Sequence, residues 1–271
     1  MTFEYCYKYA CKEYGPAAES LDVVKSVEQH RQHWRPDRVH TVLLAESHVY
    51  TPETELKEMN PQACIEGHGM PAHFVRFVYC LGYGESLFAG HVFDDNDQGT
   101  WQFWKLLSSA IRTPTAESFA PFLKTKTHPP DYKGRLVSKY ELLNRLKQDG
   151  VWLLDASILA LYGPGKYKPA PKVRKKIIEF CWENYIRQQI QEADPHSVLV
   201  VGKGVYKSLE SKLSDLSSDI QVRHVSQPQG CRKREDIDAM HQTVFDVCKN
   251  ARLARNAVCT DVGYAPVAVD R

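Results

Sequence analysis

Polar residues suited to chemistry stand directly after four short apolar runs of this chain. Such runs are typical of strands that are buried on both faces of a parallel sheet. In an open sheet of this kind, ligands bind outside the carboxyl ends of the strands. The polar residues at these ends are Glu46, Ser47, His48 and Tyr50; Asp155 and Ser157; Gly202, Lys203 and Gly204; and His224, Ser226 and Gln227. We therefore predict one shared site on this rim of the sheet.

Each of these groups also has a simpler structural explanation. A loop residue such as Glu46 or His48 is commonly hydrogen-bonded to its neighbours, and Asp155 at a strand end is commonly a cap or turn residue. The stretch 202–204 lacks the longer glycine loop and the Lys-Ser/Thr ending of a phosphate motif, although a helix N-terminus there could attract phosphate. The convergence of four strand ends therefore carries the prediction, rather than any single residue.

The eight cysteines contain no C-x-x-C pair and follow no spacing typical of a disulfide framework. Buried thiols in a reducing compartment are the expected state of such residues. An alternative is that Cys6, Cys11, Cys64 and Cys80 hold a zinc ion or an iron–sulfur cluster, although their spacing is loose. We expect a protein without a metal ion or other cofactor.

The composition is that of a globular protein. Hydrophobic residues make up 43% of the 271 residues and charged residues 25%, close to the average for folded domains. No apolar run reaches the roughly 18 residues that a membrane span requires. The N-terminal residues also lack the basic and apolar regions of a secretory signal. We expect an intracellular protein of the cytoplasm or nucleus with no membrane partner.

The net charge of +2 is small, yet basic residues cluster at 124–135, 172–176 and 232–234. A balanced total can hide a basic face. Lysine and arginine on such a face grip nucleic-acid phosphates without reading the base sequence. The cluster at 172–176 is more typical of a solvated helix face, whereas the cluster at 232–234 is more suggestive because it follows the His224 loop directly.

Strands and helices alternate along the chain. Apolar runs predict strands at 41–45, 151–157, 197–201 and 219–225. Apolar residues at helical spacing predict helices at 18–34, at 101–111, at 138–150 and after each of the last three strands. Gly150 is expected to close the helix before it in a left-handed conformation. The segment 74–85 ends in glycines and could be a strand or an aromatic loop.

This alternation implies parallel strand pairing through right-handed crossovers, with helices on both faces of the sheet. We predict a three-layer α/β/α fold with a central, mostly parallel four-stranded sheet. The whole chain, 1–271, is expected to form one domain, in which 1–17 and 257–271 are candidate extended tails.

Four sequence motifs, in this order, resemble those of the uracil-DNA glycosylase superfamily. VLLAESHVYTPE looks like the family's Gly-Gln-Asp-Pro-Tyr-His segment, or the shorter Gly-Glu-Ala-Pro-Gly form of another branch. GVWLLDASILALY is similar to the strand that ends in a base-recognising Asn. SVLVVGKGVYKSL is similar to the third strand and its glycine turn, and RHVSQPQG to the His-Pro-Ser-Pro loop. The resemblance covers about half of the chain and is best over 150–250.

The resemblance implies roles for individual residues. Glu46 falls where some branches have a Glu, and Ser47 where the best-known branch has its water-activating Asp. Asp155 takes the place of the Asn, and His224 that of the histidine that stabilises the departing base. Three departures separate the chain from a standard uracil-cleaving site: no Asp at 47, Asp for Asn at 155, and no Pro after His224.

The candidate site residues fall into three groups. The proposed catalytic residues are Glu46, Ser47, His48 and His224. The proposed base-binding residues are Tyr50, Phe77, Asp155 and Ser157, with Phe74 and Tyr79 as alternatives to Phe77 for the ring that stacks on the base. The proposed DNA-binding residues are Lys203, Ser226, Gln227, Arg232, Lys233 and Arg234, of which those at 226–234 take the place of the family's minor-groove loop.

The resemblance implies a DNA glycosylase-like enzyme that removes a damaged or deaminated base by metal-free hydrolysis, with DNA as its partner. A base inside a duplex must leave the stack before its bond to the sugar can be cut. A donor such as His224 would then stabilise negative charge on the base, and Glu46 would orient water or stabilise positive charge on the sugar. One alternative is a catalytically inactive DNA- or nucleotide-binding module of the same fold. Another, an unrelated flavodoxin-like nucleotide hydrolase, needs a stronger phosphate loop than Gly-Lys-Gly.

Overall fold

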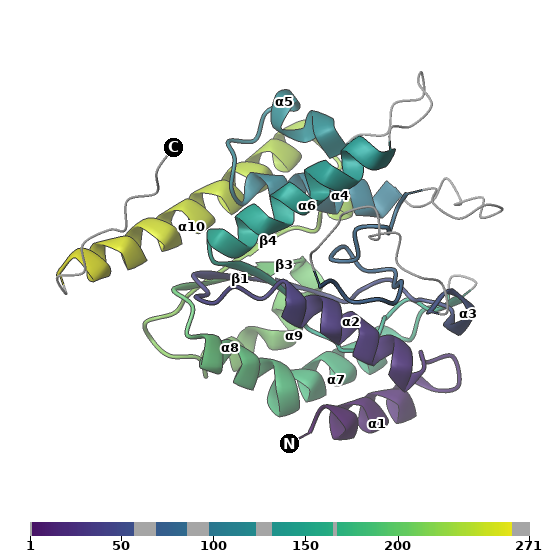
Figure 1. Ribbon diagram of the computed structural model, residues 1–271. Helices are drawn as coiled ribbons and strands as arrows, with labels where there is room; N and C mark the ends of the chain where they lie inside the picture. The colour runs from purple at the N-terminus through teal and green to yellow at the C-terminus, as the bar shows by residue number, and fades with distance from the viewer. Residues whose placement is uncertain (1, 57–68, 86–97, 123–131, 165–166, 262–271) are drawn as a thin grey trace.

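The computed structural model describes residues 2–56, 69–85, 98–122, 132–164 and 167–261 (Figure 1). Four strands form one sheet in the order β2-β1-β3-β4, and every pairing is parallel. The strands are β1 Thr41–Ala45, β2 Val151–Asp155, β3 Ser197–Val201 and β4 Gln221–Val225. The predicted α/β fold with a central four-stranded parallel sheet is therefore confirmed.

Helices flank the sheet on both faces. In Figure 1, α4, α6 and α10 lie on one face and α2, α7 and α9 on the other, with α1 packed outside against α7. The helices are α1 Phe3–Tyr14, α2 Leu21–His33, α3 Glu53–Leu56, α4 Gln98–Ser109, α5 Ala116–Phe119, α6 Tyr132–Gln148, α7 Pro171–Cys181, α8 Arg187–Ala193, α9 Lys203–Leu213 and α10 Arg234–Asp261. Single turns of 3₁₀ helix occupy Ala120–Phe122 and Pro228–Gly230, and a π-helical turn, Trp182–Ile186, joins α7 to α8.

The two helical layers explain why three strands are continuous apolar runs. Every residue of β1, β2 and β3 is buried, because a parallel sheet covered on both faces leaves no solvent-facing side. β4 lies at an edge of the sheet, and Val225 is its one fully buried residue. The register places Ala45 of β1 opposite Asp155 of β2, so these two strands end at the same level.

The segment 74–85 is an aromatic loop of bends and turns, not a strand. Its rings are buried, including those of Phe74, Phe77 and Tyr79. The phenolic oxygen of Tyr79 accepts a hydrogen bond of 2.7 Å from the backbone N–H of Leu153. Since β2 is the other edge strand, this bond satisfies a backbone donor that no neighbouring strand pairs. The aromatic loop therefore covers the free edge of β2.

Buried ion pairs fix this loop in place. Glu85, at its end, accepts hydrogen bonds from Arg135 at 2.6 Å and from Lys139 at 2.7 Å, and both bases belong to α6. Arg76, inside the loop, forms two hydrogen bonds to the carboxylate of Glu55 at 2.8 and 2.6 Å. Charge-assisted bonds of this kind are short and directional, so the loop is held at both points in a defined position.

Gly150 ends the helix before β2 in the left-handed conformation, with φ of 72°, which confirms the prediction for this residue. A β-carbon here would lie 2.2 Å from the ring of His40. The carbonyl of Gly150 accepts hydrogen bonds from the N–H groups of His40 and Thr41, at 2.7 and 3.0 Å. The close approach that only glycine permits thus aligns the start of β1 with the start of β2.

Of the two segments expected to be extended tails, the first is largely helical, and the described part of the second is helical. Residues 3–14 form α1, because Cys6, Ala10 and Tyr14 recur at helical spacing and bury one face of the segment. The last helix, α10, continues to Asp261, so the prediction of an extended chain from 257 is wrong for its first five residues. Residues 262–271 lie outside the described part of the chain.

The cysteines within the described residues are free thiols. Contact with Cys181 and burial raise the pKa of the Cys6 thiol. Cys64, one of the four candidate metal ligands, lies outside the described residues. Among the residues that are described, no group of three or more His, Cys, Asp and Glu side chains is placed to hold a metal ion. Searched over the same residues, the helices include none with the length and apolar character of a membrane span.

Candidate functional site

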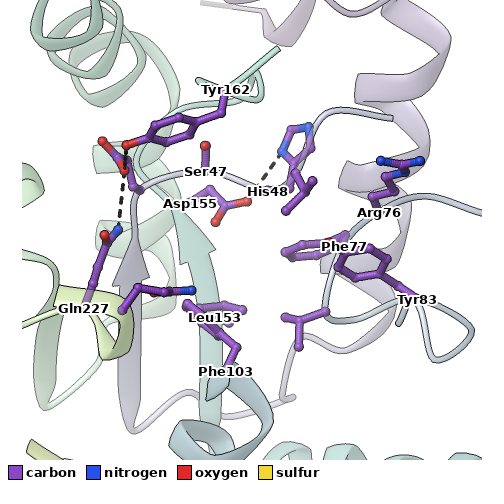
Figure 2. A pocket seen from close by; sticks show the side chains of 14 residues that line it. Ser47, His48, Arg76, Phe77, Tyr83, Phe103, Leu153, Asp155, Tyr162 and Gln227 are labelled. Carbon is purple, nitrogen blue, oxygen red and sulfur yellow. Dashed lines mark hydrogen bonds and ion pairs between the residues drawn. The ribbon is translucent and has the colours of Figure 1, made fainter. Parts of the chain in front are cut away.

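A cavity of about 440 Å³ opens at the carboxyl ends of β1 and β2 (Figure 2). Four parts of the chain form its walls: the loop after β1, the aromatic loop, the end of β2 with the loop that follows it, and the loop after β4. Phe103 of α4 closes another side. The cavity lies where the topology of a parallel sheet predicts a ligand, and its size is typical of a small-molecule site.

Six of the predicted site residues meet in this cavity. They come from segments up to 181 residues apart in the sequence and are Glu46, Ser47, His48, Phe77, Asp155 and Gln227. The structure therefore brings together the candidates after β1, at the end of β2 and after β4. The remaining candidates lie elsewhere.

Asp155 belongs to a buried ionic cluster that borders the cavity. Its Oδ2 accepts a hydrogen bond of 2.8 Å from the guanidinium of Arg31 in α2. Arg31 also pairs with Glu28, one turn earlier in the same helix. Only 2% of the Arg31 side chain and 3% of the Asp155 side chain are exposed. Ion pairs at this depth are tightly coupled, because removal of one partner leaves an unpaired buried charge.

His48 links Asp155 to a second carboxylate. Nε2 of His48 donates to Glu19 at 2.8 Å, and its Nδ1 lies 3.7 Å from Oδ2 of Asp155, an ion-pair distance (Figure 2). Glu19 in turn accepts hydrogen bonds from the backbone N–H groups of Thr51 and Ala160, at 2.7 and 3.0 Å. Glu19 thus joins the loop after β1 to the loop after β2.

The charge states follow from these partners. Burial disfavours the charged imidazolium, but Glu19 and Asp155 outweigh it and raise the pKa of His48 to about 9. Burial likewise disfavours the Asp155 carboxylate, yet His48 and Arg31 hold its pKa below the usual range. At neutral pH, His48 is therefore a cation and Asp155 an anion.

Glu46 lines the cavity next to Tyr162 and Gln227. Its Oε2 accepts hydrogen bonds from the hydroxyl of Tyr162 at 2.9 Å and from the amide of Gln227 at 3.4 Å (Figure 2). Arg174 of α7 lies 3.6 Å from the other oxygen of Glu46 and donates to Tyr162 at 2.9 Å. Burial and the neighbouring Glu46 raise the pKa of Tyr162 to about 12, so this phenol remains a hydrogen-bond donor.

Phe77 is the candidate aromatic that faces the cavity. Phe74 and Tyr79, the two alternatives, are not among the lining residues. The Phe77 ring lies 5.2 Å from the Arg31 guanidinium and 6.3 Å from the His48 ring. Since both cations are held by carboxylates, the ring is fixed in place and offers an apolar wall to a planar ligand.

Ser47 lines the cavity with a hydroxyl that accepts a hydrogen bond of 3.1 Å from Leu161 N–H. Ser157 is instead a buried loop residue, whose hydroxyl donates to the carbonyl of Leu159 at 2.8 Å. Neither Ser157 nor Tyr50 lines the cavity. Tyr50 and Ser157 were predicted to bind the base together with Phe77 and Asp155, but they do not share the cavity with those two residues.

His224 requires a correction of position. It is exposed on edge strand β4, and its ring stacks on that of Tyr206 in α9 at 4.0 Å, outside the cavity. Side chains alternate along a strand, so the burial of Val225 turns its neighbour His224 outward. Gln227, after the strand, is the residue of this segment that reaches the cavity.

The remaining DNA-binding candidates lie beside the site. Lys203, at the start of α9, and Ser226 line a second, smaller cavity of about 270 Å³. Arg232, Lys233 and Arg234 are exposed where α10 begins, and Arg234 lies 3.7 Å from Asp238. Lys203 and the three basic residues at 232–234 thus form a basic margin next to the loop that carries Gln227.

Sequence reasoning missed Glu19, Arg31, Arg76 and Tyr162. A signal for Arg31 was present, because Val24, Val27, Arg31 and Trp34 follow one helical stripe and place a charge among buried residues. An arginine on an apolar face requires a buried partner. The other three carry no comparable pattern.

Comparison with protein-family models and with curated proteins finds no match for this chain. The fold and the cavity therefore define the class of protein: an α/β protein with a parallel four-stranded sheet and, at the carboxyl ends of two strands, a largely apolar cavity that contains a few polar side chains.

Proposed function

We propose that the chain is a DNA glycosylase-like enzyme that binds a flipped base in this cavity and hydrolyses its N-glycosidic bond. The observation that carries the proposal is the meeting of Phe77, Asp155 and Glu46 in one cavity at the strand ends. An extruded base needs an apolar surface for stacking and polar groups for its hydrogen-bonding edge. Phe77 supplies the first and Asp155 the second.

The reaction consumes one water molecule. The water oxygen bonds to C1′ of the deoxyribose, and the C1′–N bond breaks with its electron pair moving to the base. A proton of the water passes to the departing base. Negative charge grows on the base and positive charge on the sugar, so a carboxylate beside the sugar and a donor beside the base both favour the transition state.

Glu46 is suited to the sugar side because its side chain, 13% exposed, is more open to solvent than that of Asp155, which is 3% exposed. There it would orient water and balance charge on the sugar. Gln227 is suited to the base side, since its amide is a donor and lies 3.4 Å from Glu46. In this proposal, Gln227 takes the role that the sequence suggested for His224.

The test uses duplexes that carry a single uracil, hypoxanthine, xanthine, ethenocytosine or 8-oxoguanine, followed by alkali to break the strand at abasic sites. Of these bases, 8-oxoguanine keeps the ring N–H and amino edge of guanine. We expect breaks at one or more of these bases, and a loss of rate of about 100-fold or more in Glu46→Gln, typical of a lost acid–base group. Absence of breaks at every base with stoichiometric protein would refute the hydrolase proposal.

A second candidate function is a binding module without catalysis. It is favoured by one observation: Glu46 is already engaged by Tyr162, Gln227 and Arg174, so it is not a free base. A protein of this class would bind the same duplexes in a polarisation assay yet release no base, and Glu46→Gln would leave binding within about threefold.

A further inference from the structure

Asp155 presents a fixed negative charge to the cavity. Arg31 and His48 both approach its Oδ2, whereas the second oxygen is turned away from His48 (Figure 2). An ionised carboxylate accepts hydrogen bonds and donates none. The donors next to Asp155, Arg31 and Nδ1 of His48, are both directed at Oδ2, so the second oxygen is the acceptor that Asp155 offers to the cavity.

We propose that the cavity selects a guanine-type base edge, in which a ring N–H and an exocyclic amino group lie side by side. This inference rests on the base-binding part of the proposed function and adds the chemical class of the ligand.

Nucleobases differ in the donors and acceptors along their hydrogen-bonding edges. Guanine presents two adjacent donors, which the second oxygen of Asp155 can accept together through its two lone pairs. Uracil and hypoxanthine present one N–H next to a carbonyl oxygen, and that oxygen would face a carboxylate oxygen. Adenine and cytosine present an amino group next to a ring nitrogen that is itself an acceptor. A polar site rejects an analogue that leaves its buried groups unpaired much more strongly than one that only changes shape.

Three residues act on Asp155 as positioning residues. Arg31 donates a hydrogen bond to Oδ2, and Nδ1 of His48 lies at ion-pair distance from the same oxygen. Glu19 fixes His48 through the 2.8 Å hydrogen bond. All four side chains are nearly or fully buried. Their paired charges prevent the carboxylate from rotating or taking up a proton, since either change would leave Arg31 or His48 with an unpaired buried charge.

The rest of the cavity fits a purine. Phe77 and Leu153 provide apolar walls, and the volume of about 440 Å³ lies in the range of nucleoside-sized sites. Arg76, which also lines the cavity, is bonded through two nitrogens to Glu55, and so its charge is balanced outside the base edge.

The experiment compares guanosine with inosine, which differ only in the 2-amino group, by titration calorimetry on the full chain. A hydrogen bond to a charged group predicts binding of guanosine about tenfold or more tighter than inosine. In Asp155→Asn the amide offers a donor, and we expect the ratio to fall below about threefold. Asp149→Asn is the matched control: Asp149 is also buried and pairs with Arg252 and Arg145, but precedes β2 at the far end of the sheet. It should keep the ratio of the parent protein.

A second arm tests the base in DNA, with duplexes that carry one guanine or one hypoxanthine opposite thymine in competition binding. Preference for guanine in this arm alone identifies an extruded nucleotide as the source, and preference among free nucleosides alone identifies a small ligand. Equal binding of the members of both pairs, or no binding in either arm, would overturn the inference even if Asp155→Asn failed to fold. Guanine preference without base release from any duplex would refute hydrolysis and keep this inference. Release of uracil without guanine preference would support hydrolysis and refute this inference.

Discussion

Glu19 accepts a 2.8 Å hydrogen bond from Nε2 of His48, and neither side chain is exposed to solvent. Glu19 precedes α2, whereas His48 follows β1, so the bond joins two segments that sequence spacing alone does not bring together. Glu19 does not line the cavity, yet through this bond it stabilises the positive charge of His48, which does.

The first prediction concerns the pH dependence of stability. The pKa of His48 is about 9 in the folded protein and 6.5 when unperturbed. Its contribution to stability is therefore complete below pH 6.5 and is lost as the pH rises through 9, with a size of about 3 kcal/mol. Urea unfolding at several pH values should show the difference between the parent protein and His48→Gln shrinking over this range.

Stability must be compared between the parent protein and His48→Gln because the pKa values of two other histidines shift in the opposite direction. Burial lowers the pKa of His30 and of His241 to about 4. Their contribution is present above pH 6.5 and is lost as the pH falls toward 4. Both are retained in His48→Gln, so they cancel in the comparison. A difference that stays constant from pH 6 to pH 10 would show that His48 is not held as a cation.

The second prediction is that Arg31→Met strongly destabilises the protein. The substitution leaves the Asp155 and Glu28 carboxylates without their guanidinium partner, and such a loss costs about 3 to 5 kcal/mol. Arg187→Met serves as the control, because Arg187 forms an exposed pair with Asp215 at 3.8 Å, worth at most about 1 kcal/mol. Equal urea midpoints for the two variants would contradict a structural role for the buried cluster.

The strand pattern made the sheet predictable. Apolar runs bounded by polar loops place β1 and β3 at the predicted residues, because a strand covered on both faces cannot hide its hydrophobicity. The aromatic loop could not be distinguished from a strand in this way, since its rings are buried for a different reason: they cover the edge of β2. Periodicity reports burial and does not report what a residue is buried against.

The cavity was predictable only in outline. Asp155 is the last residue of β2 and Glu46 follows the last residue of β1. Because these two strands end side by side, the sheet topology alone brings both residues to one rim. His224 was misplaced because one residue of difference along a strand reverses the direction of the side chain. Tyr162 and Arg76 come from loops, whose path depends on ion pairs such as Arg76 with Glu55.

The third prediction separates His224 from Gln227. His224→Ala removes an exposed ring that stacks on Tyr206 outside the cavity, so base binding and release should stay within about threefold. Gln227→Ala removes a donor from the cavity and should lower the rate of base release by about tenfold or more. The same duplex assay measures both variants. A larger loss in His224→Ala would return the role to that histidine.

The fourth prediction concerns DNA affinity. Arg232 and Lys233 are exposed beside the loop that carries Gln227. If both contact phosphates, the double alanine variant should reduce the slope of log affinity against log salt by about 2. Lys25→Ala is the control, since Lys25 of α2 pairs with Glu4 of α1, and both helices lie on the opposite side of the sheet from α10. An unchanged slope would exclude these two residues from phosphate contact.

The aromatic loop has a consequence for the behaviour of the protein in solution. The residues that wall the cavity, Phe77 and Arg76, belong to the same loop whose Tyr79 covers the backbone of β2 at Leu153. An uncovered strand edge is a template for pairing with another molecule. Substitutions that release the loop, such as Glu85→Gln, would therefore promote self-association, and light scattering would detect them as aggregates before any assay of the ligand did. Binding and colloidal stability are thus maintained by one segment.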